Sequence, residues 1–323
     1  MTFTLNKIHK AVNWNKEDDN FTQAFWEQNV KQFWLPEEIS VSKDLKVWND
    51  LSEKERDLYK KVLAGLTLLD TKQGNNGIPS MMSLTDNLQR KAVLSFMGTM
   101  EEIHAKSYSS IFTTLLSNRE IDDLFEWIEE EKTLQRKAQL ILEQYENTND
   151  EKSLYLSMVT SVFLESFLFY SGFFYPLFLA GQGKMVSSGE IISLILRDES
   201  LHGKYIGLLA KEKYESFNEE EKRQLNNKMY KIFNDLMENE IEYTKLIYKD
   251  SNLEEEVISF LQYNANRALE NLGFEDYYEV KPVNPIVLNG LSTETKTHDF
   301  FSTKGNGYQK GIYEELKDED FII

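Results

Sequence analysis

Apolar residues recur at steps of three and four through the middle of the chain, from about residue 50 to residue 270. This spacing is typical of one buried face of an α-helix. Nowhere does the sequence alternate apolar and polar residues over enough positions to build a sheet, and it contains no internal repeat of fixed period. The pattern therefore predicts an all-α protein in which amphipathic helices pack around a common core.

The periodicity predicts helices over about 51–72, 85–116, 121–145, 153–181, 218–248 and 253–271, and a further one that carries residues 192–206. Ser52 and Glu55 have the spacing of a capping box at the start of the first helix, and Ser187 and Glu190 are interpreted as a second box. The run 74–79 contains Gly, Asn and Pro and predicts a turn between two helices.

Residues 153–181 contain a single charged residue, Glu165, and are long enough to span a bilayer. The segment has no basic flank, is interrupted by Pro176, and lies among amphipathic helices with acidic faces. We therefore interpret it as a helix at the centre of a bundle rather than a membrane span. A lone carboxylate there must be protonated, paired or bound to a metal, because burying a bare charge is very costly.

Acidic and histidine side chains interrupt the apolar stripes of four predicted helices. They are Asp70, Glu101, His104, Glu165, Glu199 and His202. Two of these helices carry Glu-x-x-His, whose two side chains face the same way, and the other two carry one carboxylate each. This is the ligand arrangement of dinuclear sites in ferritin-like bundles. Four carboxylates balance the charge of two divalent ions, and oxygen ligands with two imidazoles suit iron or manganese.

Composition narrows the possible functions. The chain of 323 residues has no Cys, which excludes disulfides, thiolate metal sites and cysteine nucleophiles. Its 36 Lys and Arg against 54 Asp and Glu give a net charge of −18, which argues against nucleic acid or an anionic membrane as the main partner. No cationic, apolar leader begins the sequence, so we expect a cytoplasmic protein.

Tyr108 follows His104 by one helical turn, so its phenol is expected beside the metal ions. Two interpretations remain open for this residue. It is either a core tyrosine whose hydroxyl bonds to a ligand carboxylate, or a redox-active phenol that the metal cluster oxidises after reaction with oxygen. The site itself could store iron, oxidise a bound substrate or generate a radical.

Several runs resemble the small, radical-generating subunit of class I ribonucleotide reductase. They are EEIHAKSY at 101–108, ESF at 165–167 and RDESLHG at 197–203. The order Asp, Glu-x-x-His-x-x-x-Tyr, Glu, Asp-Glu-x-x-His matches the family at every expected ligand. GQGKM at 181–185 and the segment 300–308 are similar to the class Ib branch.

The resemblance extends from about Trp34 to the tail and implies a role for each residue. Tyr108 would carry a stable tyrosyl radical. Trp34 would lie on the radical-transfer route, Asp198 would link a metal-bound histidine to it, and Tyr308 would relay the radical to a large subunit. Of the six ligands, Asp70, Glu101 and His104 would hold one metal ion, and Glu165, Glu199 and His202 the other.

The same resemblance implies a ferritin-like domain over 1–290 and a flexible tail over 291–323 that docks on the large subunit. It also implies a homodimer, two manganese or two iron ions in each subunit, and a flavodoxin-like activator that supports manganese loading. Reduction of ribonucleotides in this family needs a thiyl radical and reducing thiols, so a chain without Cys requires a cysteine-bearing partner. After Gly273, prolines, glycines and polar residues predict an extended tail, whose end at 318–323 is either a frayed terminus or a docking peptide.

Two alternatives stay open at this point. A desaturase or monooxygenase could use the same bundle, and it would need an open substrate pocket and no radical at Tyr108. An iron-storage protein is the alternative that is not an enzyme, although its small-bundle relatives are about half this length, form cages and need no docking tail.

Overall fold

The computed structural model describes residues 9–16 and 19–292. All regular secondary structure within these residues is helical, so the prediction of an all-α protein is confirmed. The helices are α1 (Thr22–Lys31), α2 (Leu45–Asp50), α3 (Glu53–Lys72), α4 (Ile78–Leu84), α5 (Leu88–Leu115), α6 (Asn118–Glu130), α7 (Lys132–Tyr145), α8 (Glu151–Phe163), α9 (Tyr170–Gly181), α10 (Val186–Glu215), α11 (Glu219–Tyr248), α12 (Glu254–Asn271) and α13 (Pro285–Ser292). Two π-helical turns, Gln73–Gly77 and Leu164–Leu168, follow α3 and α8.

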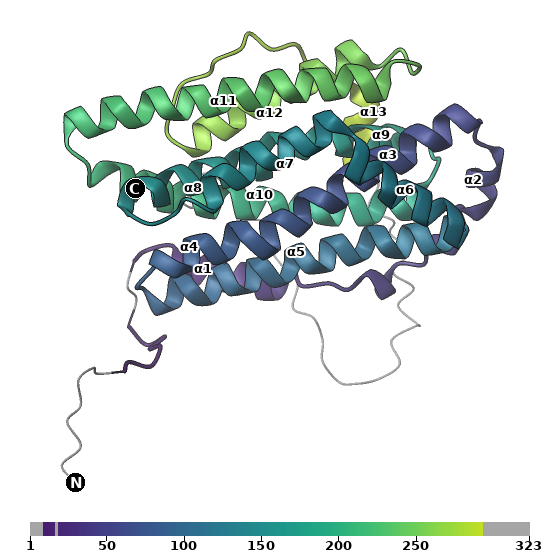
Figure 1. The fold of residues 1–323 in the computed structure, drawn as a ribbon. Coiled ribbons are helices and arrows are strands. Elements are labelled where there is room, and N and C mark those ends of the chain that lie inside the picture. Colours follow the sequence, from purple (N-terminus) through teal and green to yellow (C-terminus); the bar gives the residue numbers. More distant parts are fainter. Residues whose placement is uncertain (1–8, 17–18, 293–323) are drawn as a thin grey trace.

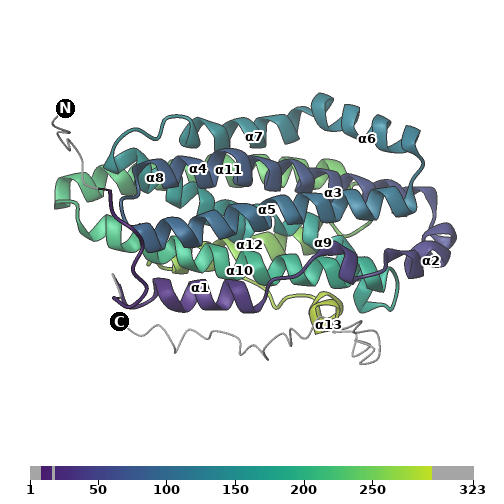
Figure 2. The same ribbon diagram turned by 90° about the horizontal axis from the view of Figure 1, so that it is seen from below.

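The long helices lie roughly along one direction and form a bundle (Figure 1). α3 packs on α5 and α9, and α10 packs on α8 and α9. α11 and α12 form a layer on one side of this group, and α1 lies on the other side against α5 and α10 (Figures 1 and 2). The four elements that carry the predicted ligands therefore meet at the centre of the bundle.

The apolar segment that raised the membrane question is a core element. Residues Glu151–Gly181 are long and apolar enough to cross a membrane, but 94% of their most apolar window is buried inside the protein. The predicted single helix is divided by the π-helical turn Leu164–Leu168. Pro176 lies inside α9 and does not break it, which corrects the interpretation from the sequence.

Two helix starts were predicted from capping boxes, and the structure supports one of them. Ser52 accepts from the backbone N–H of Glu55, and the Glu55 carboxylate accepts from the backbone N–H of Ser52. The box at Ser187 and Glu190 is wrong, because α10 begins at Val186. The carboxylate of Asp44, which lies far away in sequence, accepts from the backbone N–H of Ser187 at 3.1 Å and from that of Ser188 at 2.7 Å.

The turn predicted at 74–79 is also wrong, because the chain continues from α3 through the π-helical turn into α4. The predicted helix 121–145 consists of two helices, α6 and α7. Glu131 separates them, and its side chain accepts from the backbone N–H of Thr133 at 3.1 Å. Neither α1 nor α2 was predicted, because both precede the region of clear periodicity.

Beyond Gly273 the chain lacks helical structure as far as residue 284, and then forms α13. This short helix corrects the prediction of a continuous extended tail. It packs on α9, where a Cβ on Gly290 would lie 2.1 Å from the carbonyl oxygen of Leu177. The tail 293–323, with Tyr308, lies outside the described residues, and the domain boundary at 290 stays a prediction.

Candidate metal centre

All six predicted ligands converge at the centre of the bundle, and all are fully buried. Asp70 lies near the end of α3, Glu101 and His104 on α5, Glu165 in the second π-helical turn, and Glu199 and His202 on α10. Their potential ligand atoms form two overlapping groups in which all atoms lie within 4.8 Å of one another. One group is Asp70, Glu101, His104 and Glu199, and the other is Glu101, Glu165, Glu199 and His202.

The two groups share Glu101 and Glu199, so these two carboxylates lie between the two candidate metal positions. Nδ1 of His104 is 2.8 Å from Glu199 Oε1 and 3.4 Å from an oxygen of Asp70. Nδ1 of His202 is 2.9 Å from Glu101 Oε1. Each imidazole thus faces a carboxylate from the helix opposite its own, as expected for residues that surround two neighbouring cations.

The polar atoms of this cluster are buried without the hydrogen bonds that such atoms normally have. Several atoms of the cluster approach one another as ion pairs but form no hydrogen bond of normal geometry within the described residues: both oxygens of Asp70, Glu101 and Glu199, Oε2 of Glu165, Nδ1 of His104 and both ring nitrogens of His202. Leaving so many buried polar atoms unsatisfied is strongly unfavourable. Divalent cations at the two positions would supply the missing partners, so the residues fit a dinuclear metal site.

The pKa values of the cluster residues also favour a bound cation. Burial raises the pKa of Asp70 and Glu165 well above the ordinary value for a carboxyl group. Burial alone would lower the pKa of His202, but the negative charges of Glu101 and Glu199, which lie 2.9 and 3.4 Å from its Nδ1, raise it to about 9. Without cations the cluster therefore takes up protons, and metal binding must displace them.

Asp198 connects the cluster to Trp34. Its Oδ2 accepts a hydrogen bond of 2.7 Å from Nε1 of Trp34 and lies 3.2 Å from Nε2 of His104. Its Oδ1 accepts at 2.8 Å from Nε2 of Gln32. The Trp34 and His104 rings are stacked, with centroids 6.1 Å apart. The residue order inferred from the resemblance therefore corresponds to direct contacts in the fold.

Tyr108 lies one turn beyond His104 on α5 and is fully buried. Its hydroxyl has no hydrogen-bond partner of normal geometry among the described residues. Burial, followed by the charges of Asp70 and Glu199, raises the pKa of this phenol well above 10. The residue is therefore held as a neutral phenol beside the cluster, with Asp70 the carboxylate that acts most strongly on its hydroxyl.

Gln73 also contacts the cluster, and sequence reasoning missed it. Its Nε2 donates to Glu165 Oε1 at 2.5 Å and to Ser161 Oγ at 2.6 Å, and its Oε1 accepts from the Tyr145 hydroxyl at 2.6 Å. The sequence did not single out Gln73, because this residue directly precedes the run 74–79 that was interpreted as a turn. The available signal was its spacing, because it follows Asp70 by three residues.

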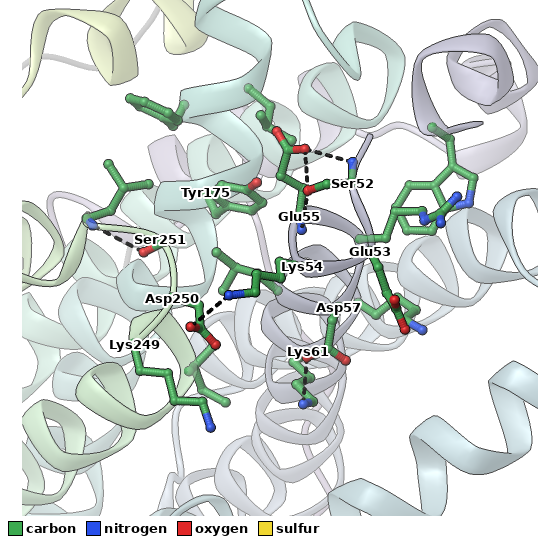
Figure 3. A pocket seen from close by; sticks show the side chains of 18 of the residues that line it. Ser52, Glu53, Lys54, Glu55, Asp57, Lys61, Tyr175, Lys249, Asp250 and Ser251 are labelled. Atoms are coloured by element: carbon green, nitrogen blue, oxygen red, sulfur yellow. Dashed lines mark hydrogen bonds and ion pairs between the residues drawn. The ribbon is translucent and has the colours of Figure 1, made fainter. Parts of the chain in front are cut away.

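A groove lined by charged side chains opens at one end of the bundle, between the start of α3 and the ends of α9 and α11 (Figure 3). Lys54 and Asp250 form an ion pair of 3.1 Å there, and Tyr175 lies on its wall. None of the six clustered residues lines this groove. It therefore does not provide the open substrate pocket at the metals that a desaturase or monooxygenase would need.

A helical bundle that encloses two overlapping groups of buried carboxylates and imidazoles defines a dinuclear metalloprotein of the ferritin-like class. The family model for the ribonucleotide reductase small chain matches residues 11–285, and the chain belongs to this family.

Individual relatives agree with this assignment. The chain is 56% identical to ribonucleoside-diphosphate reductase subunit beta of Bacillus subtilis (strain 168) over 322 residues, which are 99% of this chain and 98% of the relative. It is 40% identical to ribonucleoside-diphosphate reductase 2 subunit beta of Escherichia coli (strain K12), over 98% of this chain and 99% of the relative. The crystal structure of Streptococcus sanguinis dimanganese(II)-NrdF superposes with a TM-score of 0.85 at 44% identity, over 88% of this chain and 100% of that one. The resemblance to the class Ib small subunit is thereby confirmed.

Proposed function

We propose that this chain is the radical-generating small subunit of a class Ib ribonucleoside-diphosphate reductase. It would hold two manganese or two iron ions, store an oxidising equivalent as a tyrosyl radical on Tyr108, and pass it to the large subunit, which reduces ribonucleotides to deoxyribonucleotides. The observation that carries this proposal is the fully buried phenol of Tyr108, which lies within the electrostatic reach of Asp70, Glu101 and Glu199 in a cluster of six ligand residues.

Each residue of the centre has a task in this proposal. Glu101 and Glu199 would lie between the two metal positions, with Asp70 and His104 at one and Glu165 and His202 at the other. When bound and oxidised, the metal pair supplies a one-electron oxidant for a phenol. Tyr108 would give up one electron to this oxidant and its phenolic proton to the Asp70 carboxylate that its hydroxyl meets, because its raised pKa disfavours the phenolate. Complete burial would then keep water and reductants away from the radical.

The oxidising equivalent would leave through Trp34. The hydrogen bonds of Asp198 to Trp34 and toward His104 support this route, because one carboxylate joins the cluster to an oxidisable indole. Leu35, the next residue, is 41% exposed, so the route ends close to the surface. Tyr308 in the tail 291–323 would continue the transfer to the large subunit.

The partners and the metal follow from the family. We expect a homodimer in the cytoplasm that works with a large subunit, with a flavodoxin-like activator when manganese is loaded, and with neither nucleic acid nor membrane as a partner. The dimanganese state named for the Streptococcus sanguinis relative supports manganese in this chain. Oxygen ligands and imidazoles accept iron as well. Metal analysis of protein purified from its native host would distinguish the two.

Electron paramagnetic resonance on the full-length, aerobically reconstituted protein tests the proposal. The wild type should show a tyrosyl signal, and Tyr108→Phe should lose it while retaining two metal ions. Tyr155→Phe is a matched control, because Tyr155 is a buried tyrosine whose ring packs on Tyr214 and Phe217 instead. A signal that survives in Tyr108→Phe would contradict the assignment of the radical, and metal binding without any tyrosyl signal in the wild type would favour a substrate-oxidising or iron-storage protein.

A further inference from the structure

We propose that Gln73 is a positioning residue that fixes Glu165 as a one-oxygen ligand of the second metal position. This inference deepens the proposed function and rests on it. Gln73 is fully buried, and its amide contacts the cluster through Glu165. It acts on the metal only through the carboxylate that it holds.

The two oxygens of Glu165 have different surroundings. Oε1 accepts the hydrogen bond from Gln73 Nε2. Oε2 has no hydrogen-bond partner among residues 19–292, and it lies 3.8 Å from Nδ1 of His202 within the second group of potential ligands. One oxygen is therefore already engaged, and the other is directed at the metal position. A carboxylate held in this way binds through a single oxygen rather than rotating to chelate with two.

Neighbouring side chains set the orientation of the Gln73 amide. The Tyr145 hydroxyl donates to Oε1, which turns Nε2 toward Ser161 Oγ and Glu165 Oε1. The reversed orientation would place the amide oxygen against a carboxylate oxygen, and two acceptors would face each other without a proton. Tyr145 thus determines which end of the amide Glu165 meets.

An uncharged donor suits this place electrostatically. Four carboxylates and two divalent cations already balance, so a fifth acid at residue 73 would leave the buried site with excess negative charge. A lysine would add a positive charge that repels the cations. The glutamine amide orients Glu165 without changing the charge balance, and outer-sphere hydrogen bonds of this kind tune metal affinity in other proteins.

The local backbone makes the contact possible. Gln73 begins the first π-helical turn and Glu165 lies in the second, and turns of this type are frequent at functional sites. A Cβ on Gly77 would lie 2.3 Å from Gln73 Oε1 and 2.8 Å from ring atoms of Tyr145. Only glycine leaves room at this position for the hydrogen bond between Tyr145 and Gln73. Because Asp70 and Gln73 are three residues apart, one stretch of chain supports both metal positions.

The test compares Gln73→Met with Gln89→Met in the full-length protein. Both glutamines are buried, but Gln89 donates to backbone carbonyls of the N-terminal segment, away from the cluster. Mn(II) alone is titrated into the anaerobic apo-protein, and binding isotherms are recorded with the electron paramagnetic resonance of the bound ions. In Gln73→Met the first ion should bind normally and the second about 10- to 100-fold more weakly. The spectrum at two equivalents should then show an uncoupled ion in place of the coupled pair that the wild type and Gln89→Met give.

Unchanged affinity at both positions together with a coupled spectrum in Gln73→Met would overturn the inference. A wild type that fails to bind two ions would instead overturn the proposed function, so the two failures are distinguishable. If apo Gln73→Met does not unfold cooperatively, Tyr145→Phe is tested in its place. This variant keeps the Gln73 amide but removes the hydroxyl that fixes which end of the amide faces Glu165. The second ion should then bind more weakly than in the wild type, and equal binding would reject the role of Gln73.

Discussion

The indole nitrogen of Trp34 donates a 2.7 Å hydrogen bond to Asp198, a residue 164 positions away in the sequence. The oxygen that accepts this bond also lies 3.2 Å from Nε2 of His104, whose other ring nitrogen faces the carboxylate cluster. Gln32 holds the second oxygen of Asp198 and so fixes its orientation. One buried carboxylate therefore joins the metal centre to the indole, and each proposed member of the route can be tested separately.

Replacing Trp34 by Phe should separate radical formation from radical use. Phenylalanine preserves an aromatic ring beside His104 but has no N–H donor and is much harder to oxidise. We expect normal metal content and a normal tyrosyl signal, with turnover in the presence of the large subunit reduced to the background without this chain. Trp48→Phe serves as the control, because Trp48 is equally buried but packs on Tyr59 instead. Normal turnover by Trp34→Phe would remove Trp34 from the route.

Truncation after Phe301 tests the proposed tail. The shortened chain retains α13 and every residue of the metal centre, so metal binding and the tyrosyl signal should not change. Turnover with the large subunit should disappear, since both Tyr308 and the docking end would be missing. Tyr308→Phe in the full chain should keep binding to the large subunit and lose only turnover. Full activity of the truncated protein would show that the tail is not required.

Glu165→Ala should lower metal content without weakening the apo-protein. The change removes a carboxyl group whose pKa is raised by burial and by the charges of Glu101 and Glu199, so the apo-protein loses an unfavourable buried acid, while the Gln73 amide keeps Ser161 as an acceptor. We expect fewer than two ions per chain and an unfolding temperature of the apo-protein at or above that of the wild type. At metal concentrations about 100-fold above the dissociation constant, binding stabilises a folded protein by about 2.7 kcal/mol, so the metal-induced rise in unfolding temperature should shrink.

Glu102→Ala is the matched control for this experiment, because Glu102 neighbours the ligand Glu101 but is exposed on α5. It should bind two ions and respond to metal as the wild type does. Two ions in Glu165→Ala would show that Glu165 is not a ligand.

The sequence predicts the metal centre well because its signals are local. Asp70 and Glu165 each stand where an apolar stripe requires a core residue, and the spacing from Glu101 to His104 puts both on one helical face. A helix needs no distant partner to produce that spacing. The six residues consequently converge as the periodicity predicts, and Tyr108 lies beside them for the same reason.

Features that depend on distant contacts escaped prediction. The start of α10 follows from Asp44, which supplies the acceptor that the local box at Ser187 was expected to provide. The glycines and asparagines at 74–77 resemble a turn, yet the chain remains helical there, and Gly77 lies so close to the Tyr145 ring that a Cβ would clash with it. α13 is stabilised by its contact with α9 rather than by its own eight residues.

Asp19 should give stability a dependence on acidic pH. Burial alone would raise the pKa of this carboxyl group, but hydrogen bonds from Thr22, Phe21 and Arg90 outweigh burial and lower it below 3.8. A depressed folded-state pKa contributes stability above the unfolded value, and this contribution is lost as pH falls through the folded value. Asp19→Asn keeps an oxygen acceptor but removes the charge, so it should reduce the free energy of unfolding by about 1–2 kcal/mol at pH 7.

The difference between wild type and Asp19→Asn should narrow as the pH falls below about 4 and vanish when Asp19 is protonated. Urea unfolding of the apo-proteins at several pH values measures it. The exposed Asp86, replaced by Asn, controls for a general effect of charge and should match the wild type throughout. A constant difference between wild type and Asp19→Asn at every pH would mean that the charge of Asp19 is not the cause.

A buried ion pair outside the metal centre should contribute to the stability of the bundle. Lys137 Nζ on α7 lies 2.6 Å from Glu240 Oε2 on α11, and both side chains are almost completely buried. Ser171 donates to the other oxygen of Glu240, and the Lys137 amine lies 3.9 Å from the centroid of the Tyr243 ring. Lys137→Met leaves the carboxylate buried without its cation, which should cost about 3–5 kcal/mol of unfolding free energy.

The double variant Lys137→Met, Glu240→Gln removes both charges and still accepts from Ser171, so it should recover most of that loss. Because the pair belongs to neither group of metal ligands, both variants should bind two ions when folded. Urea unfolding of the two single variants and the double variant measures the coupling, and additive losses would show that the two charges do not stabilise each other.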